Sequence, residues 1–200
     1  MSITQQLNEI ITEWDINQTE FYKAWSKWEL SHEALCAYAS EYGNLIGVLS
    51  TGWQALGDYK QAQVEDDHFA IWERDFCTAL NTTIQTVATQ GVKDLLSDAQ
   101  AMFSDRTQAL WAMYAFIAQQ ASTSKAKIAG LQKYYDYWPA AERYFEEHLF
   151  ADRLAEKLAT MMIELSPRET KEVLDAAQKF AETLYHALDA LYEQYHSLNT

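Results

Sequence analysis

The chain has 200 residues, of which 48% are hydrophobic and 14% aromatic, and its formal net charge at pH 7 is −14. This length favours a single domain with a complete hydrophobic core, and the apolar content excludes a disordered chain. The negative charge would repel the phosphates of nucleic acids and of anionic membrane surfaces, so we expect neither of these as a partner.

The two cysteines, Cys36 and Cys77, form neither a CxxC pair nor a disulfide framework, which is typical of a reducing compartment. The first residues, MSITQQLNEIITEW, have no basic segment followed by an apolar one and so do not resemble a signal peptide. No apolar run approaches the ~20 residues that a membrane-spanning helix needs. We therefore expect a cytoplasmic protein.

Apolar residues recur at spacings of three and four along almost the whole chain, which predicts an all-α fold. Glycine and proline are few, and no flexible linker or internal repeat divides the sequence, so residues 1–200 are expected to form one bundle of seven to nine helices. The predicted helices cover approximately residues 4–14, 19–29, 32–49, 65–80, 92–103, 106–121, 122–135, 140–164 and 167–197. Residues 81–89 are expected to extend the fourth helix or to add a turn.

Three helix starts have a clear local signal. Ser31 and Asp105 are expected to act as N-caps, and Ser166-Pro167-Arg168-Glu169 is a capping box with proline at the first helical position. The stretch that follows Asp105 is apolar over most of its surface, which predicts a central helix.

Two histidines each lie one helical turn from a carboxylate within apolar, aromatic sequence. Glu65 and His68 are three residues apart, and His148 and Asp152 are four apart, so each pair is expected on one helical face. Two such helices would together offer four ligands for iron or manganese. The alternative is that each pair belongs to a solvated face, since such spacings arise by chance in an acidic helical protein.

Five segments resemble, in the same order, those of the haem-oxygenase-like superfamily, which includes the TenA, PqqC and di-iron oxidase branches. YFEEH at 144–148, followed by Asp152, resembles that family's YFxxHxxxDxxH segment, and residues 127–135 are similar to its KIxGLxKxY connection. The other matches are ALWAMYAF at 109–116, HFAIW at 68–72 and SHEALCAYASEY at 31–42. The resemblance implies a single haem-oxygenase-like helical domain and, often, a homodimer.

The resemblance also implies a set of six di-iron ligands, of which three are kept here as His68, His148 and Asp152. The other three expected positions carry Gln61, Ile117 and Ala155, none of which is a carboxylate or a histidine. Glu65 is the candidate substitute. The set Glu65, His68, His148 and Asp152 is therefore expected to hold iron in a mononuclear or weak dinuclear site, to which Glu33 or Glu41 would add a further ligand.

We expect an oxidase or oxygenase that acts on a small metabolite, and the sequence assigns no catalytic residue beyond the metal ligands. The alternative is a metal-free TenA- or PqqC-like protein, or a pseudoenzyme, that binds a small ligand or a partner protein in its helical cavity. Cys36 or Cys77 would be the nucleophile of a TenA-like enzyme, and His32 would be the proximal ligand of a haem oxygenase. The aromatic residues Tyr38, Trp53, Trp72, Trp111 and Tyr114 are interpreted as core, with the lining of an apolar pocket as the alternative.

Overall fold

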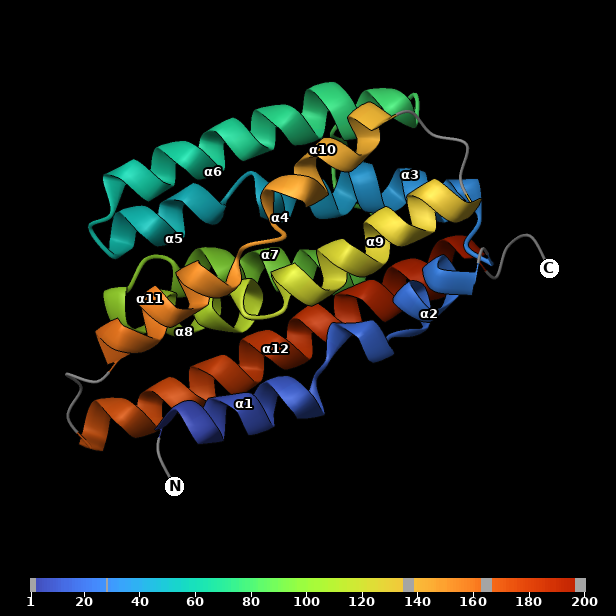
Figure 1. Ribbon diagram of the computed structural model, residues 1–200. Helices are drawn as coiled ribbons and strands as arrows, with labels where there is room; N and C mark the ends of the chain where they lie inside the picture. Colours follow the sequence, from blue (N-terminus) through green and yellow to red (C-terminus); the bar gives the residue numbers. More distant parts are fainter. Residues whose placement is uncertain (1–2, 28, 135–138, 163–166, 197–200) are drawn as a thin grey trace.

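The computed structural model describes residues 3–27, 29–134, 139–162 and 167–196, and the regular elements in these ranges are all helices (Figure 1). The α-helices are α1 (Ile3–Glu13), α2 (Glu20–Lys27), α3 (His32–Ala37), α4 (Gly43–Ile46), α5 (Leu49–Ala55), α6 (Tyr59–Ile71), α7 (Gln90–Met102), α8 (Arg106–Ile117), α9 (Gln120–Tyr134), α10 (Pro139–Glu147), α11 (Asp152–Met162) and α12 (Pro167–His196). A short 3₁₀ helix, η1 (Ile16–Gln18), precedes α2. The all-α prediction is confirmed.

Helix α8 lies in the centre of the bundle, as its sequence predicts. Every residue from Ala109 to Ile117 is buried, and α8 packs against α5, α7, α9, α11 and α12. The long α12 runs beside α1, α7 and α8 and closes one side of the bundle (Figure 1). The aromatic side chains of Tyr38, Trp53, Trp72, Trp111 and Tyr114 are all buried in this core.

The predicted helix starts agree with the structure where it describes them. The Ser31 and Asp105 side chains accept hydrogen bonds from the backbone N–H groups of Ala34 (3.1 Å) and Gln108 (2.9 Å). Helix α12 begins at Pro167, although Ser166 of the predicted capping box lies outside the described residues. Helix α6 begins earlier than expected, at Tyr59, because Asp58 caps it by accepting from the N–H of Gln61 (3.1 Å).

Two π-helical segments, one after α3 and one after α6, contact each other, and this contact fixes the position of α6. Segment η2 (Tyr38–Tyr42) continues α3 into α4, and η3 (Trp72–Cys77) extends α6. The indole N–H of Trp72 donates to the Ala39 carbonyl (2.8 Å), which links the two segments. A Cβ on Gly43 would lie 2.6 Å from the Trp72 indole nitrogen, so glycine permits this close approach. Wide helical turns of this kind often occur at functional sites.

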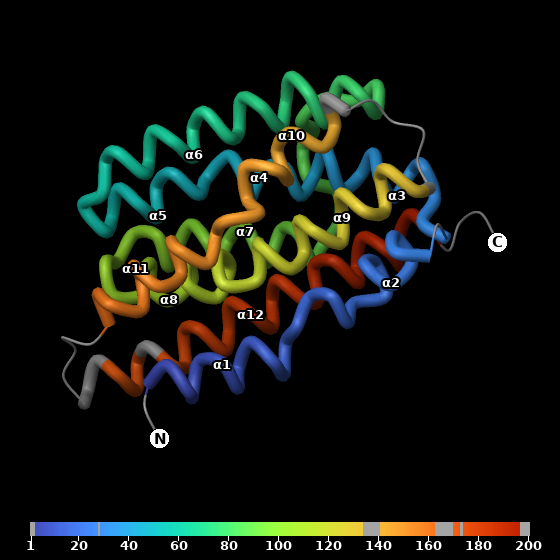
Figure 2. The backbone as a smooth tube through the Cα atoms, in the orientation of Figure 1, coloured from blue at the N-terminus to red at the C-terminus, as the bar shows by residue number. Residues whose placement is uncertain are grey.

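Two predicted helical stretches are wrong. Residues 82–89 are not helical, and the chain leaves the helix at Asn81, which has a positive φ of 53°. The predicted helix over 140–164 is two helices, α10 and α11, with a bend at residues 148–151 (Figure 2). The two halves pack against different partners, since α10 contacts α9, η3 and α6 whereas α11 contacts α8. Tertiary packing, rather than a glycine or proline, breaks this helix.

Among the residues that the structure describes, no helix combines the length and the apolar character that crossing a lipid bilayer requires.

Candidate metal centre

One face of α6 carries the polar side chains that point into the bundle towards α10. Gln61, Glu65 and His68 are spaced by four and three residues, which places them on a single helical face. Glu65 is only 2% exposed. Its two carboxylate oxygens lie 3.3 Å from the Gln61 amide nitrogen and 3.3 Å from His68 Nδ1, so residues one turn away on each side hold the carboxylate in place.

His148 reaches the same space from the end of α10. Its backbone N–H donates to the Phe145 carbonyl (3.1 Å), three residues back, as is common in the last turn of a helix. The Tyr144 carbonyl, four residues back, is therefore available to the imidazole. Nδ1 of His148 lies 2.7 Å from that carbonyl oxygen. A carbonyl can only accept, so Nδ1 carries the hydrogen and Nε2 keeps a lone pair. This is the orientation that metal-binding histidines take.

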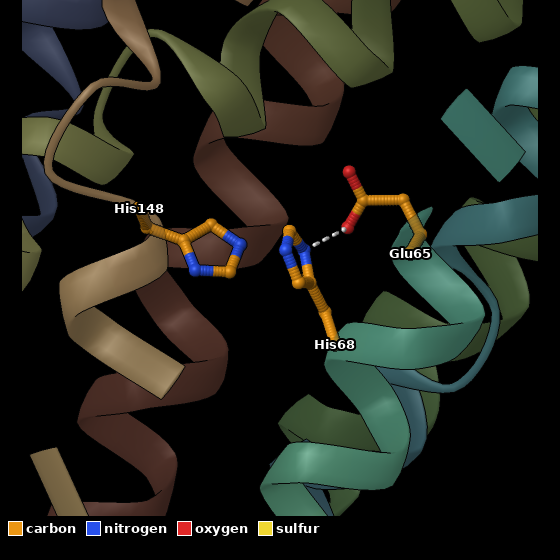
Figure 3. A group of neighbouring side chains, drawn as sticks. All are labelled: Glu65, His68 and His148. Atoms are coloured by element: carbon orange, nitrogen blue, oxygen red, sulfur yellow. Dashed lines mark hydrogen bonds and ion pairs between the residues drawn. The ribbon is translucent and has the colours of Figure 1, made fainter. Parts of the chain in front are cut away.

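The three side chains form one compact group (Figure 3). One potential ligand atom from each of Glu65, His68 and His148 lies within 4.8 Å of those of the other two. The imidazole of His68 stands between Glu65 and His148, and the two imidazole ring centres are 4.6 Å apart. Among the described residues this is the only group of three or more histidine, cysteine or acidic side chains so close together.

The environment sets the charge of each donor. Burial lowers the pKa of His148 to about 4, with the nearby His68 adding to the effect, so His148 is neutral near pH 7. Burial raises the pKa of the Glu65 carboxyl, but the hydrogen bond and charge of His68 outweigh it, and the net pKa is lowered. The group therefore offers a cation the Glu65 carboxylate and the neutral His148 imidazole, and the His68 imidazole lies between these two donors.

Tyr144 adds a hydroxyl that has no hydrogen-bond partner among the residues that the structure describes. Its ring centre is 4.4 Å from that of His148 and 4.7 Å from that of Trp72, and its hydroxyl oxygen is buried without a hydrogen bond. Burial, followed by the charge of Glu65, raises the pKa of Tyr144 well above its usual value, so the hydroxyl stays protonated. A buried, unsatisfied hydroxyl beside such a donor set fits a site completed by a further group.

The fourth predicted ligand, Asp152, does not join this group. It is the exposed first residue of α11, because the bend at 148–151 interrupts the helical face that the four-residue spacing presumes. Of the positions where the resemblance expects further ligands, Ile117 is buried at the end of α8 and Ala155 packs against the core. Gln61 contacts Glu65, as described above.

The other candidates from the sequence also lie elsewhere. Glu41 accepts hydrogen bonds from the N–H groups of Ala88 (2.9 Å) and Thr89 (2.8 Å), ahead of α7, and Glu33 is exposed. His32 is exposed, with Nε2 3.4 Å from Cys36 Sγ.

Neither cysteine is an activated nucleophile. Burial raises the pKa of Cys36, and burial together with the charge of Glu73 raises the pKa of Cys77 to about 12. Both thiols therefore stay protonated near pH 7, whereas a nucleophilic cysteine needs a lowered pKa.

Two residues of this region receive no role from the sequence alone. Gln61 stands at an expected ligand position that it does not fill, and its four-residue spacing from Glu65 is the signal for their hydrogen bond. Tyr144 belongs to the YFEEH segment, and its four-residue spacing from His148 is the signal for its place beside that imidazole.

Comparisons with known proteins agree with the fold. No protein-family model matches the chain. Curated relatives include 4-aminobenzoate synthases from Chlamydia muridarum (27% identical over 216 residues, covering 96% of this chain and 91% of the relative) and Nitrosomonas europaea (26% identical over 225 residues, covering 96% and 91%).

Three solved structures share the architecture. A Shewanella denitrificans domain with a haem-oxygenase-like fold aligns over 100% of this chain and 96% of its own, with a TM-score of 0.82 at 13% identity. A TenA homologue from Pseudomonas syringae aligns over 96% and 93% (TM-score 0.77, 14% identity), and a CADD-like protein from Nostoc punctiforme over 99% and 96% (0.72, 14%). The chain has the haem-oxygenase-like fold, which confirms the fold predicted from the sequence.

Proposed function

We propose that the chain is a non-haem iron oxidoreductase that acts on a small metabolite, with Glu65, His68 and His148 as the ligands of a single ferrous ion. The observation that carries the proposal is the buried group of two imidazoles and one carboxylate. Two histidines and one carboxylate on one side of an iron ion, with the other positions open, are the ligand set of many oxygen-using non-haem iron enzymes.

The fit of iron to this group rests on the chemistry of the donors. Glu65 supplies an anionic oxygen, and Nε2 of His148 is left with its lone pair by the bond of Nδ1 to the Tyr144 carbonyl. Iron bound here would supply redox chemistry with molecular oxygen. With no ligand atom at Ile117 or Ala155, the donor set favours one ion over two.

The protein's own residues have three tasks in this scheme. Gln61 holds one Glu65 oxygen and leaves the other directed towards His68. The core aromatics around His148 exclude water from that side of the group. The protonated Tyr144 hydroxyl can donate a hydrogen bond to a species in the group, since no acceptor in the described ranges holds it.

The relatives' name suggests which product to test first. We infer that an aromatic amine such as 4-aminobenzoate is the product class, on the support of relatives that are 26–27% identical and align over nearly the whole chain. Growth of a 4-aminobenzoate auxotroph that expresses the chain would support this product, and failure by a chain that binds iron would direct the search to other oxidations.

Metal analysis tests the proposal directly. Protein purified without chelator and reconstituted with Fe(II) under anaerobic conditions should hold about one iron per chain by mass spectrometry. Glu65→Ala and His148→Ala should lose this iron while keeping their helical circular dichroism. Asp152→Ala is the matched control, because it removes an exposed carboxylate four residues from His148 and should leave the iron content unchanged. Equal iron content in Glu65→Ala and Asp152→Ala would contradict the assignment.

A second candidate function is a metal-free ligand-binding protein that keeps the fold without the chemistry. The observation that favours it is that Gln61, Ile117 and Ala155 stand where the family resemblance expects carboxylate or histidine ligands. No iron above background in the same experiment would support this candidate and exclude the first.

The location and assembly of the protein remain proposals. Unpaired Cys36 and Cys77 suit a cytoplasmic protein. Light scattering on the purified chain would test the predicted homodimer.

A further inference from the structure

A histidine and a cysteine come together on α3, outside the candidate metal centre. His32 is the first residue of this helix and Cys36 follows four residues later, so both side chains lie on one helical face. Nε2 of His32 lies 3.4 Å from Sγ of Cys36. Imidazole nitrogen and cysteine sulfur are both ligands that Zn²⁺ takes in proteins.

The separation of these two atoms fits two ligands of one tetrahedral ion. With a Zn–S bond of about 2.3 Å and a Zn–N bond of about 2.0 Å, two ligands at the tetrahedral angle lie about 3.5 Å apart. The observed separation of 3.4 Å agrees with this value. A linear ion with bonds of the same lengths would need the two atoms about 4.3 Å apart. The geometry of the pair therefore favours a tetrahedral ion over a linear one.

Neighbouring segments hold both side chains in place. Ser31 caps α3, and its hydroxyl donates to the Tyr195 carbonyl at the end of α12 (3.2 Å), which anchors the turn that carries His32. Sγ of Cys36 lies 3.5 Å from the Leu80 carbonyl oxygen. A carbonyl can only accept, so the thiol hydrogen points to Leu80 and the sulfur lone pairs are left for His32. The two donors therefore need little rearrangement to bind an ion.

An open pocket of about 430 Å³ lies at this pair, and its wall includes His32, Cys36, Glu33 and Glu41. Burial, followed by the charge of Glu33, raises the pKa of the Cys36 thiol, so the Glu33 carboxylate lies near the sulfur and would attract a cation to it. Glu41 is engaged by two backbone N–H groups and by the Tyr195 hydroxyl, so it is not counted as a ligand. None of the proposed iron ligands lines this pocket.

We propose that His32 and Cys36 bind Zn²⁺ in a second metal site, separate from the proposed iron centre. The thiol gives its proton to water when the sulfur binds the ion, and the imidazole binds through Nε2, so nothing is oxidised or reduced. A sulfur ligand favours Zn²⁺ over Mg²⁺ and Ca²⁺, which prefer oxygen. Two of the four tetrahedral positions stay open to the pocket, where water or a small anionic ligand completes the site.

Cobalt titration of the intact chain under anaerobic conditions tests this site apart from the iron centre. Co²⁺ replaces Zn²⁺ in tetrahedral sites, and cobalt bound to a thiolate has a sulfur-to-metal charge-transfer band in the near ultraviolet. The iron centre offers only imidazole and carboxylate, so cobalt bound there has no such band. The band should saturate at about one Co²⁺ per chain and disappear when Zn²⁺ is added. Absence of the band at excess Co²⁺ would overturn the proposal.

Variants of the two ligands assign the band. Cys36→Ser should abolish it. His32→Gln should weaken cobalt binding at least about tenfold, because the loss of even a hydrogen-bonding partner of a ligand costs about 10- to 100-fold. His32 is exposed, so this variant should keep the helical circular dichroism. His186→Gln is the matched control, since it removes an exposed histidine of α12 that does not line the pocket, and it should bind cobalt as the wild type does. A band that persists in Cys36→Ser, or equal affinity in His32→Gln and His186→Gln, would overturn the site.

Discussion

The burial of Lys127 predicts an unusual dependence of stability on pH. In the unfolded chain this lysine has its ordinary pKa of 10.5, whereas burial lowers the pKa in the folded protein to about 7. Between these values the unfolded chain binds more protons than the folded one, so the free energy of unfolding rises as the pH rises. The cost of burial is fully present below about pH 7 and disappears above about pH 10.5.

The magnitude follows from the size of this difference. One pKa unit corresponds to about 1.4 kcal/mol, so the full cost is about 5 kcal/mol. Between about pH 7.5 and about pH 9.5 the wild type should gain about 2.5 kcal/mol relative to Lys127→Met, which has an unbranched side chain of similar length and no charge. The groups that face Lys127 do not titrate in this window, because burial raises the pKa values of Tyr22 and Tyr38 and lowers that of His148 to about 4.

Urea denaturation at the two pH values measures this difference. The wild type, Lys127→Met and Lys125→Met are unfolded in parallel, and only Lys127→Met should change its stability relative to wild type with pH. Since Lys125 is exposed on the same helix, its variant controls for the loss of one positive charge. A difference between wild type and Lys127→Met that is the same at both pH values would refute the reasoning, because it would show that Lys127 stays charged in the folded protein.

Three further predictions concern contacts of α6, η2 and α4. Gln61→Leu removes the amide that holds one Glu65 oxygen and should weaken iron binding by about 10- to 100-fold, measured by titration under anaerobic conditions. Glu41→Ala removes the oxygen that accepts from two backbone N–H groups ahead of α7 and should lower the free energy of unfolding in urea by about 1–3 kcal/mol. Gly43→Ala forces a methyl group against the Trp72 indole and should cost about 1–3 kcal/mol in the same assay, and an unchanged stability would mean that the two π-helical segments are not closely packed.

Much of the fold could be predicted because local signals and tertiary packing agree in it. The residues after Asp105 are apolar on all sides, and the helix that they form is buried on all sides. Ser31 and Asp105 cap the helices that they precede, since a capping side chain bonds only to its own first turn. These features depend on neighbours within a few residues, and a sequence displays such neighbours directly.

The errors occur where distant segments decide the outcome. The bend at 148–151 contains no glycine or proline, and it exists because α10 and α11 pack on different helices. Lys127 lies among Ala126, Ile128 and other residues of ordinary helical sequence, so nothing nearby indicates that its amine faces aromatic rings from α2, η2 and α10. No spacing rule within one helix contains this information.

The same bend connects the fold to the candidate metal centre. In an uninterrupted helix the backbone N–H of His148 would bond to the Tyr144 carbonyl, and Asp152 would share the face of His148. In the structure that N–H bonds to Phe145, and the Tyr144 carbonyl accepts from the His148 imidazole. The end of α10 thus separates Asp152 from the group and orients His148 within it. What this segment contributes to the group is therefore set by where a helix ends: a single well-oriented histidine, His148, replaces the His148–Asp152 pair that the sequence spacing predicts.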